Sequence, residues 1–212
     1  MLTRQVIRTA VEAALEEDAP NGDITCETTI PAEVHGTARL VSRQEGVMSG
    51  IAVFEAAFAA QNPTIRVLAT IKDGERFEAG QTLAEVEGSV RDLLTAERVA
   101  LNFAQRMCGI ATMTAAFVKA ADEAVETTDY RKPRTYARTR IVDTRKTTPG
   151  LRPFEKSPSP AAADIIIATD CPMPSWSKTT ISRHSPNKAS IWPGRFATSA
   201  NKWDIPRISK WK

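Results

Sequence analysis

Apolar and polar positions between residues 3 and 87 follow two different periods, and together they predict a mixed α+β domain. Residues 3–17 follow the helical period, with Thr3 in the position of an N-terminal cap. Residues 36–50 and 64–87 alternate with the strand period, and Asp-Gly and Ala-Gly pairs mark turns within the second stretch. The alanine-rich residues 51–61 predict a short helix between them. The apolar face of the first helix is formed by Val6, Ala10, Val11, Ala14 and Leu15.

A long helical stretch is predicted after these strands. Ser89 and Asp92 have the spacing of a capping box, with Asp in place of the usual Glu. Apolar residues then recur at helical spacing as far as Cys108. Gly109 predicts a break or a kink, after which a second helix runs to about Ala124.

A polar cluster follows the next apolar run, which covers residues 138–142 and predicts a short buried strand. Ligands of parallel α/β folds bind at the carboxyl ends of strands. The cluster, residues 143–148, is Asp-Thr-Arg-Lys-Thr-Thr, and Pro149-Gly150 provides the turn after it. Two cations and three hydroxyls suit a small ligand with several negative charges. Judged by composition alone, a solvated polar loop remains the alternative.

Two other groups of charged residues permit both a functional and a structural interpretation. Arg98, on the long helix, is either a cation directed at an anionic substrate or a surface residue paired with a carboxylate such as Glu97. An acidic cluster near the N-terminus is either a metal site or a solvated helix end followed by a turn. Its members are Glu16, Glu17, Asp18 and Asp23.

The composition is that of a soluble globular protein, with 42% hydrophobic and 25% charged residues among 212. The N-terminus lacks the apolar core of a signal peptide, and no apolar run is long enough to span a membrane. We therefore expect a cytoplasmic location. The cysteines are Cys26, Cys108 and Cys171, and their spacing fits neither a metal site nor a disulfide framework, so we expect small buried side chains or spare thiols.

The net charge of +3 conceals a change in composition after Lys156. Residues 157–212 carry a charge of +5 and residues 1–156 a charge of −2. All four tryptophans and seven of the 13 prolines also lie in the last 56 residues. A basic tail raises the possibility of nucleic-acid binding, but its charges are scattered and form no helical stripe.

Four segments of the chain carry a family resemblance. They are Ala14-Leu-Glu-Glu-Asp18 with Gly22-Asp-Ile-Thr25, then Glu45-Gly-Val-Met-Ser-Gly-Ile51, then Leu94 to Asn102 with Gly109-Ile-Ala-Thr112, and finally Ile141 to Lys156. In order and spacing they resemble quinolinate phosphoribosyltransferases, the carboxylating nicotinate-nucleotide pyrophosphorylases, throughout residues 1–156. The last segment, with the string Asp-Thr-Arg-Lys-Thr-Thr-Pro-Gly-Leu-Arg, is the most specific.

The resemblance implies a fold and a reaction. The fold is α/β: an N-terminal α+β sandwich domain over residues 1–112, followed by the start of an α/β barrel over residues 113–156. The reaction converts quinolinate and phosphoribosyl pyrophosphate to nicotinate mononucleotide, pyrophosphate and carbon dioxide, a step of NAD biosynthesis, with Mg²⁺ as the cofactor. No metal ligand and no catalytic residue is assigned.

The resemblance also implies site residues and partners. In the family, the arginine that matches Arg98 reaches the neighbouring active site across a dimer interface, and the residues that match Thr144, Arg145 and Lys146 bind substrate. We therefore expect a homodimer or higher homo-oligomer, with no nucleic-acid or membrane partner. The two carboxylates of quinolinate are suitable ligands for these cations.

The chain departs from the family after Lys156, where the family continues with a barrel strand and a Gly-Gly-Gly-x-Asn-His-Arg motif. A shifted reading frame accounts for this departure. If each new codon is read from the third base of one codon and the first two bases of the next, the degenerate codons permit the family's sequence. The junction of Asp170 with Cys171, for example, is forced to encode the family's Leu. We interpret residues 157–212 as an out-of-frame tail, disordered or non-native in structure, which has no reason to keep hydrophobic periodicity.

This interpretation leaves two expectations for function. The first is a phosphoribosyltransferase whose sequence carries a frame error near Lys156, and the second is a catalytically dead truncated product that is able only to dimerise through its N-terminal domain. A barrel with one authentic strand cannot close. For the chain as written we therefore expect no activity.

Overall fold

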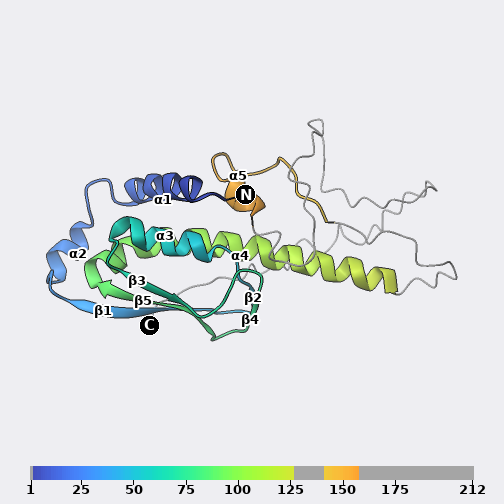
Figure 1. Cartoon of the computed structure of the whole chain (residues 1–212), viewed down its shortest axis with the longest axis horizontal. Coiled ribbons are helices and arrows are strands. Elements are labelled where there is room, and N and C mark those ends of the chain that lie inside the picture. The colour runs from blue at the N-terminus through green and yellow to red at the C-terminus, as the bar shows by residue number, and fades with distance from the viewer. Residues whose placement is uncertain (1, 127–140, 158–212) are drawn as a thin grey trace.

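The computed structural model of the chain describes residues 2–126 and 141–157 (Figure 1). Two helices come first, five strands and one helix follow, and a long and a short helix end the described part. The elements are α1 (Arg4–Asp18), α2 (Ile24–Thr29), β1 (His35–Val41), β2 (Gly46–Val47), α3 (Ile51–Gln61), β3 (Arg66–Ala69), β4 (Arg76–Phe77), β5 (Thr82–Ser89), α4 (Val90–Glu126) and α5 (Arg152–Lys156).

The described strands form two antiparallel sheets. The larger has the order β1-β5-β3, so the central strand β5 is hydrogen-bonded on both sides. Strands β2 and β4 form the smaller sheet. Helices α1, α3 and α4 are stacked on one side of the larger sheet (Figure 1). This arrangement confirms the predicted α+β sandwich in the N-terminal part of the chain.

The hydrophobic core lies between the larger sheet and helices α3 and α4. Phe54 and Phe58 of α3 are fully buried. Their ring centroids lie 5.1 Å apart in an edge-to-face arrangement, which aromatic quadrupoles favour. Helix α4, which packs on α3, carries a row of fully buried alanines at a spacing of four residues. Small side chains on one face allow close approach of the two helices. The alanines are Ala96, Ala100 and Ala104.

Hydrogen bonds fix the ends of the first two helices. The hydroxyl of Thr3 caps α1, as predicted. The Oδ1 of Asp23 caps α2 by accepting from the backbone N–H of Cys26 at 3.0 Å. Arg91 of α4 donates to two backbone carbonyls near the end of α2. Helix α2 was not predicted, because six residues are too few to show a helical period.

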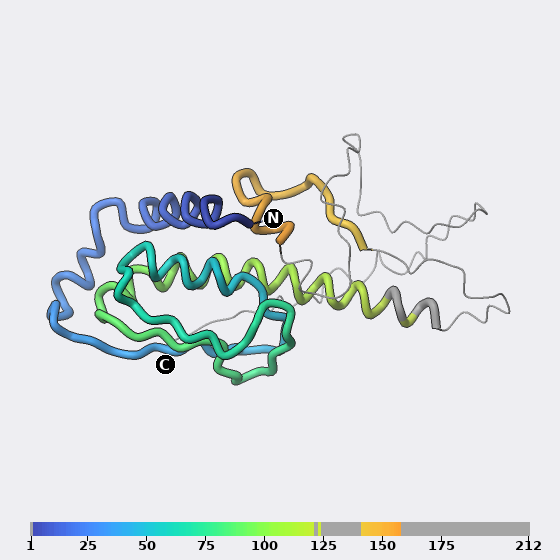
Figure 2. Tube along the Cα trace, viewed as in Figure 1, coloured from blue at the N-terminus to red at the C-terminus, as the bar shows by residue number. Residues whose placement is uncertain are grey.

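Helix α4 is continuous across Gly109, so the predicted break there is wrong (Figure 2). Its 37 residues correspond to a length of about 55 Å. Residues on either side of Gly109 hold the helix in place. Cys108 is buried, while Ala111 and Ala115 pack against Val47 of β2. Thr112 Oγ1 also accepts from the backbone N–H of Val47 at 2.9 Å. These contacts outweigh the cost of about 1 kcal/mol of a glycine inside a helix.

Most other predicted elements agree with the structure. The helices expected over residues 3–17 and 51–61 are α1 and α3, and the two alternating stretches contain β1 to β5. The strand expected over residues 138–142 is absent at Ile141 and Val142, and its first three residues lie outside the described part. Within the part of the chain that the structure describes, no helix combines the length and apolarity needed to cross a membrane.

The limits at residues 112 and 156 that the resemblance implies remain predictions. Helix α4 passes without interruption from the first expected domain into the second. The described residues contain no strand after β5, so they show no part of a barrel sheet. The proposed out-of-frame tail, residues 157–212, lies outside the described residues apart from Ser157.

The two cysteines in the described residues are free and buried, as expected. Burial, assisted by a hydrogen bond with Asp23, raises the pKa of the Cys26 thiol to about 11. Burial raises the pKa of Cys108 to about 12. Both thiols are therefore protonated at neutral pH and are poor nucleophiles. Cys171 lies outside the described residues.

Candidate functional site

The segment of residues 141–157 packs on the middle of α4 through its short helix α5 (Figure 1). Phe154 of α5 is 1% exposed and belongs to the main hydrophobic core. Its ring centroid lies 5.0 Å from that of Phe103 on α4. Leu151 adds a further apolar contact with the core. The segment is therefore anchored to the sandwich, although it comes well after α4 in the chain.

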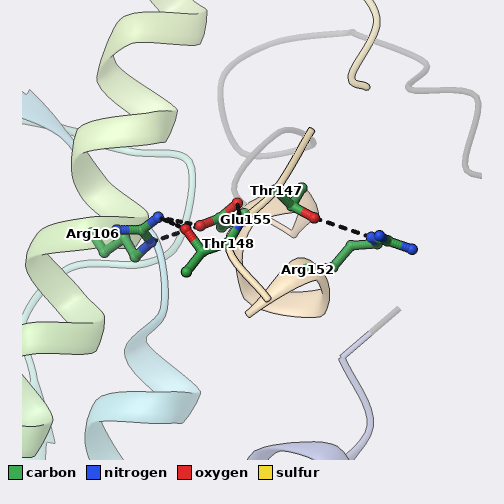
Figure 3. Close-up of polar contacts among 5 residues, drawn as sticks. All are labelled: Arg106, Thr147, Thr148, Arg152 and Glu155. Carbon is green, nitrogen blue, oxygen red and sulfur yellow. Dashed lines mark hydrogen bonds and ion pairs between the residues drawn. The ribbon is translucent and has the colours of Figure 1, made fainter. Parts of the chain in front are cut away.

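A polar cluster lies beside this apolar anchor and joins α4 to the segment (Figure 3). Arg106 Nε of α4 donates to Glu155 Oε1 of α5 at 2.9 Å, and Arg106 Nη2 donates to the same oxygen and to Thr148 Oγ1. Glu155 Oε2 in turn accepts from the backbone N–H of Thr148 at 3.0 Å. We call these three residues the clasp.

The carboxylate of Glu155 is largely buried, since its side chain is 10% exposed. Burial by itself raises the pKa of Glu155, but hydrogen bonds from Thr148 and Arg106 and the positive charge of Arg106 outweigh burial, so the pKa is lowered overall. Glu155 is therefore ionised at neutral pH. The clasp is a charge-assisted network and not a neutral contact.

The loop between Asp143 and Thr148 carries three of the predicted site residues. Thr144 is half-buried, and its Oγ1 accepts from the backbone N–H of Lys146 at 3.1 Å. Arg145 and Lys146 are exposed, and neither forms an ion pair within residues 2–126 and 141–157. Within the described part of the chain, the loop thus presents Arg145 and Lys146 as two adjacent exposed cations.

An ion pair connects the two ends of the segment. Lys156 Nζ lies 3.1 Å from Asp143 Oδ2, and the two side chains are 21% and 19% exposed. The Asp143 oxygen is itself inaccessible to solvent. A pair as buried as this one would leave an uncompensated charge if either partner were removed. Asp143 therefore has an ion-pair partner in this segment, whereas Arg145 and Lys146 have none among the residues that the structure describes.

Arg98 lies apart from this loop within one chain. Its guanidinium Nε is 3.3 Å from Asp18 Oδ1, at the far end of α1 from α5 (Figure 1). Arg98 and Arg106 are eight residues apart on α4, which corresponds to about 12 Å along the helix axis. The side chain of Arg98 is 72% exposed, so its partner contributes little stability. The carboxylate at ion-pair distance from Arg98 is therefore that of Asp18, and not that of Glu97.

Two of the four acidic residues near the N-terminus have structural roles. Asp18 pairs with Arg98, and Asp23 caps α2. Hydrogen bonds from Cys26, first from its side chain and then from its backbone, lower the pKa of Asp23. The described residues contain no group of three His, Cys, Asp or Glu side chains that could hold a metal ion. The metal interpretation of this cluster is therefore unsupported, and we assign no step to Mg²⁺.

A cleft of about 750 Å³ opens among α1, α2 and α4, away from the loop. Its lining includes Asp23, Arg91 and Asp92, which already make contacts within the fold. The clasp, by contrast, contains residues that were not among the predicted site residues. Arg106 had a detectable signal, because a cation recurs on α4 two turns after Arg98. Glu155 had none beyond its place in the family-like segment.

Comparisons with known proteins agree with this description. Residues 23–108 match the family described as quinolinate phosphoribosyl transferase, N-terminal domain. A quinolinate phosphoribosyltransferase [decarboxylating] 1b of Nicotiana tabacum is 37% identical over 151 residues, which are 71% of this chain and 39% of the relative. A nicotinate-nucleotide pyrophosphorylase [carboxylating] of Mycobacterium leprae (strain TN) is 40% identical over 154 residues, covering 70% of this chain and 49% of the relative.

Solved structures show the same fold. The crystal structure of NadC from Streptococcus pyogenes superposes with a TM-score of 0.67 at 36% identity, covering 76% of this chain and 53% of that chain. The nicotinate-nucleotide pyrophosphorylase of Francisella tularensis gives the same TM-score at 28% identity. The chain spans about 39% to 49% of the length of the two curated relatives named above.

The sandwich and its anchored cationic loop thus define the N-terminal part of a phosphoribosyltransferase. Through this part, the chain belongs to the quinolinate phosphoribosyltransferase family.

Proposed function

We propose that the chain contributes to the transfer of phosphoribosyl from phosphoribosyl pyrophosphate to quinolinate, with loss of carbon dioxide. The products are nicotinate mononucleotide and pyrophosphate, in NAD biosynthesis. The observation that carries the proposal is the loop with Arg145 and Lys146, which is anchored on α4 while both cations stay exposed. The names of the two relatives agree with this reaction.

The chemistry of the loop fits a dicarboxylate. The guanidinium of Arg145 can receive one carboxylate through two parallel hydrogen bonds, and the ammonium of Lys146 supplies a compact charge for the other. With the ring held in this way, its nitrogen can be directed at the ribosyl carbon, which lowers the entropic part of the barrier. Thr144 supports the loop by accepting from the backbone of Lys146.

Arg98 completes the site from a neighbouring subunit in this proposal. Support comes from its 72% exposure and from its position beside Asp18, the last residue of α1. Asp18 lies beside Nε of Arg98, and the guanidinium has two further nitrogens that can donate to an anion. The protein would then be a homodimer or higher homo-oligomer. We further propose a cytoplasmic location and a requirement for Mg²⁺.

The reaction gives a direct test. Quinolinate labelled in its 2-carboxyl group is incubated with phosphoribosyl pyrophosphate, Mg²⁺ and the purified full chain, and released carbon dioxide and pyrophosphate are measured. Release of the two products in equal amounts, lost in Arg145→Ala and kept in the matched surface variant Lys119→Ala, would refute the alternative of a catalytically dead product. If neither product forms, the activity is refuted for this chain, and the alternative of a product able only to dimerise is favoured.

The shifted reading frame is a separate proposal about the gene. Its support is the agreement of the forced codons with the family, together with the limit of the curated matches to about 71% of the chain. We expect resequencing across codons 154–160 to show a missing or additional base near the codon of Lys156. An intact frame there would show that residues 157–212 are a true divergent tail.

A further inference from the structure

The position of the loop from Asp143 to Thr148 relative to α4 depends on a small number of contacts. The loop's own backbone hydrogen bonds are local, for example from the N–H of Thr147 to the carbonyl of Arg145 at 3.0 Å. They shape the turn but do not attach it to the sandwich. Attachment comes from the ring of Phe154 in the core and from the clasp.

The clasp acts at the end of the loop that carries the cations. Glu155 uses one carboxylate oxygen for Arg106 and the other for the backbone N–H of Thr148. It therefore couples the backbone of the loop, two residues after Lys146, to a side chain of α4. Phe154 secures only the helix α5 that follows. Loss of the clasp would leave α5 docked but would remove the polar contacts between the loop and α4. The loop would then be held to α5 by the Asp143–Lys156 ion pair and by the exposed hydrogen bond from Arg152 Nε to Thr147 Oγ1.

We propose that Arg106 and Glu155 are positioning residues, which hold the loop so that Arg145 and Lys146 form a preformed pair of cations for a dicarboxylate. Neither residue contacts the ligand in this proposal, which rests on the proposed function for the identity of that ligand. The ordering of a flexible loop would otherwise reduce the affinity for the ligand. Because the clasp orders the loop before the ligand binds, this cost does not reduce the affinity.

Trypsin provides a readout of loop position that does not depend on any ligand, because it cleaves after Arg145 and Lys146. In the full chain, Arg106→Ala and Glu155→Ala are each expected to increase native-state cleavage at these two bonds about tenfold. The double variant should be no worse than either single one, since both act through one network. Arg106→Lys, which retains a positive donor, should restore part of the protection. Arg8→Ala, which removes a surface ion pair on α1, is the matched control and should have no effect.

Quinolinate affinity, measured by calorimetry on the same variants, is the second readout. We expect the dissociation constant to rise about tenfold in Arg106→Ala and Glu155→Ala, and to recover partly in Arg106→Lys. Unchanged cleavage, or faster cleavage with unchanged affinity, would overturn the positioning role. Failure of the unaltered chain to bind quinolinate would refute the proposed function, and the ligand part of this inference with it. The cleavage data distinguish that result from a failure of the clasp.

Discussion

Replacement of Phe54 with alanine is expected to lower the free energy of unfolding by about 3–5 kcal/mol, the range for loss of a fully buried aromatic ring. Phe54 has no exposed surface, and its ring contacts Phe58 in the middle of the core. The change leaves a cavity between α3, α4 and the sheet that close-packed neighbours cannot fill. Urea denaturation of the full chain, followed by circular dichroism, measures the effect.

Phe117→Ala is the matched control for this experiment. Phe117 lies on α4 but is 41% exposed, so its removal is expected to change stability by only about 0.5 kcal/mol. Phe54→Leu, which keeps most of the apolar volume, should fall between the two variants. If Phe54→Ala and Phe117→Ala unfold at the same urea concentration, the assignment of Phe54 to the hydrophobic core would be contradicted.

The largest expected effect on ligand binding concerns the two exposed cations of the loop. Arg145→Ala and Lys146→Ala are each expected to weaken quinolinate binding by about 10- to 150-fold, which corresponds to about 1.5–3 kcal/mol for a lost hydrogen bond to a charged group. Both side chains lack ion-pair partners within the described residues, so their removal leaves the fold intact. Calorimetric titration of the full chain with quinolinate measures the change.

The comparison with a monocarboxylate sharpens this test. Nicotinate has one carboxylate fewer, so the unaltered chain should prefer quinolinate, and the loss of either cation should reduce that preference. Lys119→Ala removes an exposed cation of α4 that pairs with Glu123, and it should leave both affinities unchanged. Equal losses for quinolinate and nicotinate in Arg145→Ala and in Lys119→Ala would indicate a general effect of charge and would exclude a specific dicarboxylate site.

Local sequence patterns were sufficient for the elements that depend on local physics. The helical period of residues 3–17 and its cap at Thr3 predicted α1, because one apolar stripe and one hydroxyl determine both. Gly109 shows the limit of this reasoning. Its helix-breaking tendency is outweighed by contacts between neighbouring residues of α4 and strand β2, which is distant in sequence.

In the site, too, local patterns were readable from the sequence, whereas contacts between distant residues were not. The cations of the loop were identifiable from the string after residue 142, and the family resemblance assigned them a ligand. The clasp was not identifiable, because Arg106 and Glu155 are separated by 49 residues. A contact of this kind depends on the packing of Phe154 against Phe103, which no local period reveals. The pairing of Arg98 with Asp18 was missed because it depends on the packing of α1 against α4, which is likewise not visible in a local pattern.

The continuity of α4 has a consequence for the variation that the gene can tolerate. One helix carries Arg98 at one position and Arg106 two turns later, without a loop that could absorb a change in length. Insertion of a single residue between them would turn every later side chain by about 100° and move it by about 1.5 Å. Arg106 would then face away from α5, and Ala111 and Thr112 would lose β2. We therefore expect insertions and deletions in this stretch to be selected against among natural variants.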